Sequence, residues 1–363
     1  MTLLFAVIFV ALVFEYINGF HDTANSIATI VSTKVLTPRQ AVVMAAVTNL
    51  LGAMAGTAVA KTISSGLVDA KLVSLTSDII ICALLGAIIW NLLTWWLGLP
   101  SSSSHALIGG LCGAALAAAG NNWNVILWSL PSSQHWWLGK GLLWKVIVPM
   151  VTSPIAGFVL GFCFMAFLYF MLRNARPAPV NRFFGVAQIF SAGGMGFMHG
   201  TNDAQKTMGI IALTLLGATK AGQLEGLPGW LRFLHMPTPA AGQELDIATW
   251  IKVVCALTMA SGTAAGGWRI IKTLGHKMVK LHPINGFAAE SSSATVILAA
   301  SLLGIPVSTT HNISAAIMGV GAARRLNAIK WYVVERMVWA WILTIPVSGA
   351  LGYGFVKLRQ MFG

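Results

Sequence analysis

Two apolar stretches of this sequence each contain an aspartate. Asp22 lies in INGFHDTANSIATIV beside His21, and Asp203 lies in FMHGTNDAQKTMGII. A charged side chain near the centre of a bilayer costs about 2.5–3.5 kcal/mol on insertion scales, so it is tolerated where it faces a polar cavity. A carboxylate in such a cavity can hold a proton or a cation. Because Gly19 and Gly200 lie three residues before the two aspartates, we expect each helix to unwind there and expose backbone groups.

Two hydroxyl-rich turns form a second pair. PSSSSH (100–105) and PVSTTH (306–311) each place a proline and several hydroxyl groups at the start of an apolar segment. A helix N-terminus offers unpaired N–H groups and the positive end of the helix dipole, which together favour an anion. For one copy, simple capping of the helix is an alternative; two copies favour helix ends that converge on one anion. The expected anion ligands are Ser102, Ser103, Ser104, Ser308, Thr309 and Thr310, with His105 and His311 orienting the turns.

The composition indicates whether these motifs lie in a soluble or a membrane protein. The chain has 363 residues, of which 56% are hydrophobic and only 9% charged, and its mean hydropathy is +0.77. A soluble domain carries about 25% charged residues, whereas the apolar runs that recur here have the length of a membrane helix. The net charge of +13 resides in short loops between these runs, which is typical of membrane proteins and argues against a nucleic-acid partner. We therefore expect an all-α polytopic protein embedded in a lipid bilayer.

Ten hydrophobic segments account for most of the chain. Two of them are short and begin at the hydroxyl-rich turns, so they either cross the membrane or form one arm of a re-entrant hairpin. These two are 102–119 and 307–322. The ten expected segments cover roughly 3–31, 40–60, 78–98, 102–119, 142–172, 183–215, 248–267, 283–303, 307–322 and 331–356.

The sequence also repeats itself. NGFHDTANS matches HGTNDAQKT at an offset of 181 residues, and GLPSSSSH matches GIPVSTTH at an offset of 206 residues. The chain therefore divides into a first repeat (1–172), a basic linker (173–182) and a second repeat (183–363), which form one integrated unit. Each repeat contains five segments, so if all of them cross the membrane the second repeat is inverted relative to the first.

Charges in the loops support the inversion. Four loops, at 32–39, 173–182, 268–282 and 323–330, contain Lys and Arg but neither Asp nor Glu. The acidic loop residues all lie in the other connections. By the positive-inside rule the four basic loops are cytoplasmic, so both termini are expected outside the cytoplasm. Inverted repeats are the build plan of secondary transporters, whose site lies near the midplane where the repeats meet.

Acidic groups beside an anion site imply a co-transported proton or cation. Hydrogen phosphate carries a proton that a carboxylate can accept, whereas fully ionised sulfate does not. Glu290, in NGFAAESSSATVIL, is a third acid within an apolar segment and is expected to carry a proton. Glu15 and Glu335 are instead interpreted as structural. No hydrolase or oxidoreductase constellation accompanies these residues, so we expect a transporter and not an enzyme.

At these residues the chain resembles the inorganic phosphate transporter (PiT) family. NGFHDTANS and HGTNDAQKT are similar to its paired signature, commonly written GANDVANA, and PSSSSH and PVSTTH are similar to its paired serine/threonine turns. The resemblance runs over nearly the whole chain and is closest to the bacterial low-affinity phosphate transporters. It implies symport of inorganic phosphate with H⁺ or Na⁺ across the bacterial inner membrane. In the bacterial branch it implies transport as a neutral complex with a divalent metal, and it also implies a homodimer.

The resemblance implies roles for residues of the two signatures. By motif, Asp22, Asn25, Asn202 and Asp203 resemble the substrate- and ion-binding residues of the family. The candidate site comprises Asn25, Gln205 and Lys206 with the six hydroxyl residues of the turns for phosphate, and His21, Asp22, Asn202, Asp203 and Glu290 for the coupling ion.

Two positions depart from the family signature. The Asn of the first signature is His21 here, and the trailing Asn of the second is Lys206. Sodium requires uncharged or anionic oxygen ligands, which neither residue supplies. Lys206 can place its ammonium where sodium would sit or pair with phosphate directly, and histidine is the residue type whose ordinary pKa lies near neutral pH. We therefore expect a phosphate importer that is coupled to protons, works by alternating access and has no cofactor. A sodium-coupled symporter and a sulfate permease on the same scaffold are the alternatives.

Overall fold

The computed structural model describes residues 2–65, 67–69, 72–73, 75–130, 139, 141–237 and 246–362. Within these ranges the regular secondary structure is helical, apart from one isolated bridge between Val68 and Ile126. The α-helices are α1 (Thr2–Ser32), α2 (Pro38–Ala53), α3 (Ala58–Ser65), α4 (Ser77–Leu97), α5 (Ser103–Ala118), α6 (Val148–Met171), α7 (Pro177–Lys220), α8 (Thr249–Ala265), α9 (Trp268–Lys272), α10 (Pro283–Leu302), α11 (Thr309–Arg324) and α12 (Trp331–Phe362). The 3₁₀ helices are η1 (Trp123–Val125), η4 (Gly229–Leu234) and η6 (Leu326–Ala328), and the π-helical turns are η3 (Leu143–Ile147) and η5 (Thr273–Lys277).

The ten hydrophobic segments predicted from the sequence are helical, as expected. One of them, 40–60, is interrupted: α2 ends at Ala53, Gly56 adopts a φ of 111°, and α3 begins at Ala58. By length and hydropathy, α1, α4, η3 with α6, and α12 are each long and apolar enough to cross a membrane. The helical segments and these spans confirm the predicted polytopic α-helical membrane protein.

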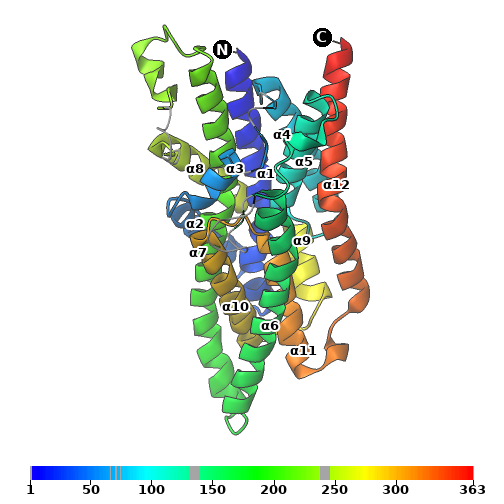
Figure 1. Cartoon of the computed structure of the whole chain (residues 1–363). Helices are drawn as coiled ribbons and strands as arrows, with labels where there is room; N and C mark the ends of the chain where they lie inside the picture. Colours follow the sequence, from blue (N-terminus) through cyan, green and yellow to red (C-terminus); the bar gives the residue numbers. More distant parts are fainter. Residues whose placement is uncertain are drawn as a thin grey trace.

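The two halves of the chain run in opposite directions. Figure 1 shows both termini at one end of the molecule, here called the terminal end, and the connection between α6 and α7 at the opposite end, here called the linker end. Equivalent helices exchange partners between the repeats: α1 packs against α8 and α7 against α2, while α5 packs against α12 and α11 against α6. The inverted arrangement therefore interlocks the two repeats.

The two short segments form arms of re-entrant hairpins. α4 and α5 pack against each other across a turn at 98–102, in which Gly98 has a φ of 65°. α10 and α11 are joined in the same way across 303–308, with Gly304 at a φ of 62°. In Figure 1 the first hairpin lies toward the terminal end and the second toward the linker end. At 16 residues each and about 1.5 Å per residue, α5 and α11 are too short for a hydrocarbon core of about 30 Å.

The predicted unwinding of the helices at Gly19 and Gly200 is wrong. α1 and α7 are continuous through both positions. The glycines instead allow helices to touch: a Cβ on Gly19 would lie 2.4 Å from the carbonyl oxygen of Met259, and one on Gly200 would lie 2.3 Å from that of Asn49. The two hairpin turns reach the middle of the protein, where Thr310 contacts Asp22 and Ser104 contacts Lys206. Polar side chains of the intact helices α1 and α7 therefore meet the exposed helix starts of α5 and α11.

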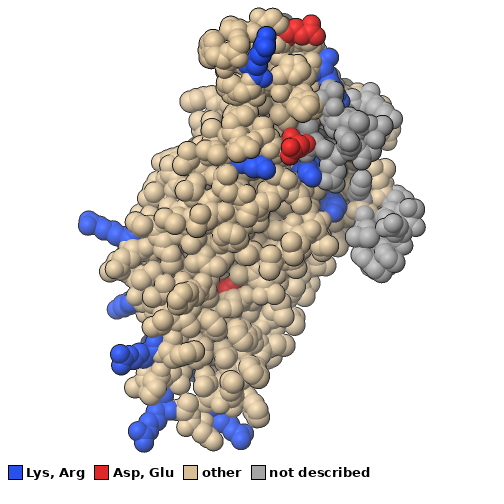
Figure 2. Space-filling model, turned by 90° about the vertical axis from the view of Figure 1, so that its left-hand side faces the viewer, with Lys and Arg blue, Asp and Glu red and all other residues tan. Residues whose placement is uncertain are grey.

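Basic residues gather at the linker end. On the face shown in Figure 2, Lys and Arg occupy the lower end without Asp or Glu, whereas acidic residues accompany them at the upper end. Lys280, Arg324, Arg325 and Lys330 line a cavity that also touches α6 and α10. This charge asymmetry is the one that the inverted topology predicts, because the loops expected on the cytoplasmic side lie at this end.

Close packing of α5 against α12 can be tested at Gly113. A Cβ at this position would lie 2.0 Å from the carbonyl oxygen of Gly349, so we expect Gly113→Ala to lower the free energy of unfolding by about 1–3 kcal/mol. Gly217→Ala is the matched control, because nothing lies within 4 Å of that position in α7 and alanine favours a helix by about 1 kcal/mol over glycine. Thermal unfolding in detergent measures both variants. An unchanged or higher melting temperature for Gly113→Ala would contradict this packing.

Candidate functional site

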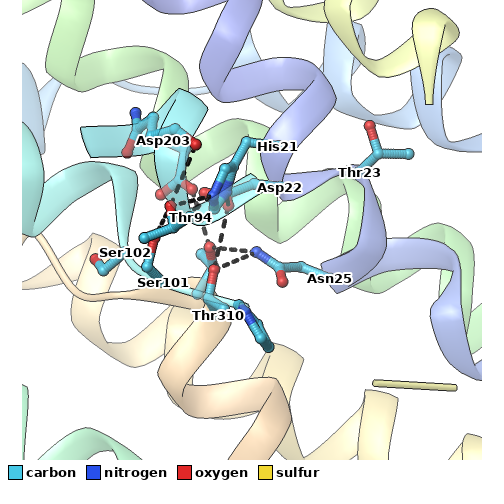
Figure 3. Close-up of polar contacts among 12 residues, drawn as sticks. His21, Asp22, Thr23, Asn25, Thr94, Ser101, Ser102, Asp203 and Thr310 are labelled. Carbon is cyan, nitrogen blue, oxygen red and sulfur yellow. Dashed lines mark hydrogen bonds and ion pairs between the residues drawn. The ribbon is translucent and has the colours of Figure 1, made fainter. Parts of the chain in front are cut away.

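The two hairpin turns meet the middle of α1 and α7 at a buried polar group, here called the central cluster. Its members are His21, Asp22, Asn25, Ser104, Asp203, Lys206, Thr309 and Thr310, and each is at most 3% exposed. Figure 3 shows His21 and Asp22 directed toward Asp203, and Asn25 reaching Thr310. Because every member is buried, this conformation encloses the cluster away from solvent at both ends.

Asp22 is held by groups from α1 and from the second hairpin. The Nδ1 atom of His21 lies 2.8 Å from Oδ1 of Asp22, and the Thr310 hydroxyl donates to the same oxygen over 3.3 Å. One turn further along α1, the Asn25 amide donates to the hydroxyl oxygens of Thr309 (3.1 Å) and Thr310 (2.9 Å). The long helix of the first repeat therefore contacts the turn of the second repeat.

The second ring nitrogen of His21 connects the cluster to the first hairpin. Nε2 lies 3.2 Å from the Thr94 hydroxyl and 3.5 Å from the Ser101 hydroxyl, and these two hydroxyls are 2.8 Å apart. Neither Thr94 nor Ser101 was predicted. Ser101 belongs to the serine run and could have been identified from it, whereas Thr94 lies in an apolar helix and carries no motif signal.

Asp203 is paired with a buried cation. The Lys206 ammonium contacts the Asp203 carboxylate and the Ser104 hydroxyl, and it donates to the carbonyl oxygen of Val307 over 3.2 Å. The second carboxylate oxygen of Asp203 accepts a hydrogen bond from the Thr309 hydroxyl over 2.9 Å. The ammonium is thus surrounded by a carboxylate, a hydroxyl and a carbonyl oxygen, which are ligands that hard metal cations also prefer.

Asn25 and Lys206 occupy equivalent positions in the two repeats. They align at the same offset of 181 residues that aligns the two aspartates. Asn25 binds Thr310 at the start of α11, and Lys206 binds the equivalent residue, Ser104, at the start of α5. The two repeats therefore build the same contact, but the second places a full positive charge where the first has a neutral amide.

The hydroxyl-rich turns cap two helices and also supply hydroxyls to the central cluster. The hydroxyls of Ser102 and Ser308 each accept the backbone N–H of the histidine three residues later, His105 and His311, over 3.2 Å. The next hydroxyls of the second turn, Thr309 and Thr310, belong to the central cluster, as does Ser104 of the first turn. Ser103 differs, because its hydroxyl has no hydrogen-bond partner among the described residues. Two helix starts therefore meet at the central cluster, as an anion site requires.

Besides Ser102, Ser103 and Ser308 of the turns, three further predicted site residues lie outside the central cluster. The Gln205 side-chain oxygen accepts the backbone N–H of Val59 over 2.7 Å and so caps the start of α3. Asn202 donates to the Ser301 hydroxyl near the end of α10 over 3.0 Å. The third is Glu290, which lies on α10.

Glu290 forms a separate buried acidic site. Its carboxylate accepts hydrogen bonds from the hydroxyls of Thr29 and Ser191, and from the Gln188 amide over 3.0 Å. Thr29 lies two turns beyond Asp22 on α1, which places this group on the linker side of the central cluster. Both carboxylate oxygens therefore have donors without any contribution from the cluster.

His199, to which no role was assigned from the sequence, lies against the central carboxylates. Its Nε2 is 3.1 Å from Oδ2 of Asp203, and its Nδ1 is 3.1 Å from the side-chain oxygen of Asn49. One ligand atom from each of Asp22, His199 and Asp203 lies within 4.8 Å of the others, a geometry that could hold a metal ion. The signal for His199 was present, since it precedes Asp203 by four residues and so lies on the same helix face.

The charges of the central cluster do not cancel. Asp22 and Asp203 share the cluster with one ammonium, that of Lys206, so the cluster carries one net negative charge when His21 is neutral. Burying an uncompensated charge is costly. The cluster therefore combines hydroxyl and amide donors suited to an anion with carboxylates that need a further positive partner.

Comparisons with known proteins bear on this arrangement. The family model described as "Phosphate transporter family" matches residues 18–182 and again residues 172–352, once for each repeat. A protein of Bacillus subtilis (strain 168) named "Probable low-affinity inorganic phosphate transporter" is 43% identical over 346 residues, which cover 95% of this chain and 94% of that protein. A protein of the same name from Rhizobium meliloti (strain 1021) is 43% identical over 350 residues, covering 96% and 94%.

A solved structure shares the architecture. It is described as "The sodium-dependent phosphate transporter", and it aligns with a TM-score of 0.80 over 99% of this chain and all of its own length, at 24% sequence identity. At that identity the likeness shows the fold alone. The family itself is shown by the match to both repeats and by relatives that align over nearly the full length. The chain therefore belongs to the phosphate transporter family, as its paired signatures and turns predict.

Proposed function

We propose that this chain imports inorganic phosphate across the bacterial plasma membrane by proton symport with alternating access. The family, and the names of relatives that are described as low-affinity inorganic phosphate transporters, support phosphate as the substrate. Phosphate binds at the central cluster between the starts of α5 and α11. There the hydroxyls of Ser103, Ser104, Thr309 and Thr310 and the amide of Asn25 supply donors, together with the two helix dipoles.

The observation that carries the proposal is the charge balance of the central cluster. Asp22, Asp203 and Lys206 together contribute one net negative charge, and phosphate adds one or two more. An anion added to a buried, already negative site is unfavourable unless a positive charge enters with it. Phosphate binding is therefore linked to binding of a proton or a cation, which is the thermodynamic requirement for symport.

Lys206 favours the proton over sodium as the coupling ion. Its ammonium already donates hydrogen bonds to oxygen atoms of Asp203, Ser104 and Val307, so these atoms are not available as ligands for a sodium ion. His21 places a ring nitrogen beside Asp22, where sodium would need an oxygen ligand. Sodium coupling is the alternative, since the solved structure of the same fold is described as sodium-dependent.

The two hairpins supply the gates for alternating access. The α4–α5 hairpin lies toward the terminal end and the α10–α11 hairpin toward the linker end, and each contributes one turn to the buried cluster (Figure 1). Movement of one hairpin relative to α1 and α7 opens the cluster toward one side while the other hairpin keeps it closed. The basic linker end faces the cytoplasm, and the termini face outward.

Uptake into proteoliposomes distinguishes the coupling ions. With the pH gradient acid outside and no sodium, we expect radiolabelled phosphate to accumulate, and arsenate, a phosphate mimic, to compete. A sodium gradient at equal pH on both sides should give no accumulation, because Lys206 already provides the cation beside Asp203. Accumulation that requires sodium would contradict proton coupling. Uptake of sulfate in place of phosphate would contradict the substrate assignment.

The two central aspartates are expected to be essential for uptake. Asp203→Asn leaves the Lys206 ammonium buried without its carboxylate, and breaking a buried pair costs about 3–5 kcal/mol, so we expect uptake to fall about a hundredfold or more. Asp22→Asn should have a comparable effect, and both variants should still insert into the membrane. Asp78→Asn is the control, because Asp78 pairs with a half-exposed Arg359 away from the cluster. Normal uptake by either central variant would remove these aspartates from the site.

A second candidate function is transport of phosphate as a complex with a divalent metal. The observation that favours it is the group formed by Asp22, His199 and Asp203, whose ligand atoms lie close enough to share one ion. Three protein ligands leave positions of an octahedral ion open, and Mg²⁺ is commonly held by one or two carboxylates together with phosphate oxygens. The metal in this scheme is cargo that enters and leaves with phosphate.

Chelation tests the metal–phosphate candidate. If the complex is the transported species, we expect EDTA to reduce phosphate uptake at least about tenfold, because the remaining carboxylates repel the free anion, and added Mg²⁺ to restore it. A radioactive divalent metal should accumulate together with phosphate, and His199→Leu should weaken this co-accumulation. Phosphate uptake that is unchanged by the chelator would contradict this candidate and identify the free ion as the substrate.

A further inference from the structure

A buried carboxyl group outside the central cluster has no role in the function proposed above. Glu15, on α1, is 0% exposed. Its Oε2 atom accepts a hydrogen bond from the Thr207 hydroxyl of α7, whereas its Oε1 atom has no hydrogen-bond partner in the described part of the chain. The side chain of Asn18 lies beside the same carboxyl, and its amide oxygen also lacks a donor within that part.

The charged groups around Glu15 do not neutralise an ionised carboxylate. On α7, Lys206 is near, but its ammonium is bound to Asp203, and that carboxylate adds a like charge. On α8, the titratable group that faces Glu15 is the Cys255 thiol. On α4, Asp78 pairs with Arg359 and is not part of this group. An ionised Glu15 would therefore be a second uncompensated negative charge in the same region of the protein.

A proton on Glu15 solves both problems. The neutral acid avoids the free energy of burying an unpaired charge. The proton also belongs on Oε1, the oxygen that accepts no hydrogen bond from the described residues. The hydrogen bond from Thr207 to Oε2 is compatible with the protonated and the ionised form. Glu15 is thus built to hold a proton while Lys206 is paired with Asp203.

Glu15 also lies on the same face of α1 as Asp22. Seven residues, or two helical turns, separate them, which corresponds to about 10 Å along the helix axis. A further seven residues lead to Thr29, whose hydroxyl donates to Glu290. Three acidic groups therefore lie along the length of α1. Glu15 and Asp22 belong to this helix, with Glu15 on the terminal side of the central cluster, and Glu290 of α10 contacts it on the linker side.

We propose that Glu15 is a binding site for the coupling proton on the terminal side of the central cluster. This inference rests on the proposed proton symport of phosphate. Binding converts the carboxylate into the carboxylic acid, release reverses this, and no other bond changes. A negative charge on Glu15 repels phosphate about 10 Å away, so protonation raises phosphate affinity about tenfold. By reciprocity, bound phosphate raises the proton affinity of Glu15 by the same factor.

Glu15→Gln tests the proposal in the whole chain reconstituted into proteoliposomes. The amide has the shape of the protonated acid and keeps an acceptor for Thr207, but it has no proton to release. We expect accumulation of phosphate under a pH gradient to fall at least about tenfold, while exchange of phosphate at equal pH on both sides is retained. Wild-type exchange should weaken as pH rises, because Glu15 loses its proton, and exchange by the variant should weaken less.

Two further variants separate proton binding from a structural role. Glu335→Gln changes an exposed carboxyl on α12 and should leave both activities intact. Thr207→Val removes the hydroxyl that stabilises the ionised form of Glu15, so Glu15 should hold its proton to higher pH. Exchange by Thr207→Val should therefore persist to higher pH than in the wild type. A structural role alone would lower activity without moving this pH dependence.

The outcomes also separate this inference from the proposed function. If wild-type protein does not accumulate phosphate under a pH gradient, proton symport itself is refuted. If the wild type accumulates phosphate and Glu15→Gln does so equally, Glu15 is not the proton site. If correctly inserted Glu15→Gln loses exchange together with accumulation, Glu15 acts in phosphate binding or folding, and the proposal is likewise overturned.

Discussion

Compensation of buried charge is the constraint on which this structure depends. Two carboxylates lie in the middle of long apolar helices, where each must find hydrogen-bond donors or a cation. Asp22 finds them in a neighbouring imidazole and a hydroxyl, and Asp203 finds them in an ammonium and a hydroxyl. Both hydroxyls come from the start of α11, which the second re-entrant hairpin places in the middle of the protein. The re-entrant hairpins, the glycine contacts that let helices approach, and the buried polar network all follow from this requirement.

The inverted repeats make the scaffold nearly symmetric, but the charges at its centre are not. A site that is reached from either side benefits from two equivalent helix starts, because each can remain in contact while the other moves away. The asymmetry is concentrated at one pair of equivalent positions, the amide of Asn25 and the ammonium of Lys206. This one difference between the repeats adds a positive charge to the central cluster, and in the proposed function it reduces the number of positive charges that must enter with phosphate.

The sequence predicted the helical segments, the inversion and the pairing of signatures with turns, because hydropathy, loop charge and internal repetition are local signals. It could not place partners that depend on packing. Thr94 has no motif, and Gln205 lies inside a signature yet caps α3. The expected opening of α1 at Gly19 failed for a physical reason: side chains of an intact helix already reach the turns, so no backbone group has to be released. His199 is the opposite case, because its position four residues before Asp203 on one helix is visible in the sequence and predicts their contact.

The packing of helices between repeats also determines when each hairpin meets its partner during synthesis. α11 packs against α6, which is translated earlier, so the second hairpin finds its partner on arrival. α5 packs against α12, and its glycines fit the backbone at Ile345 and Gly349, which the ribosome delivers much later. Until α12 is made, the face of α5 that carries these glycines has no partner in the second repeat. A nascent chain that stops before α12 therefore lacks the packing partner of α5, although the first signature and the first hydroxyl-rich turn have already been synthesised.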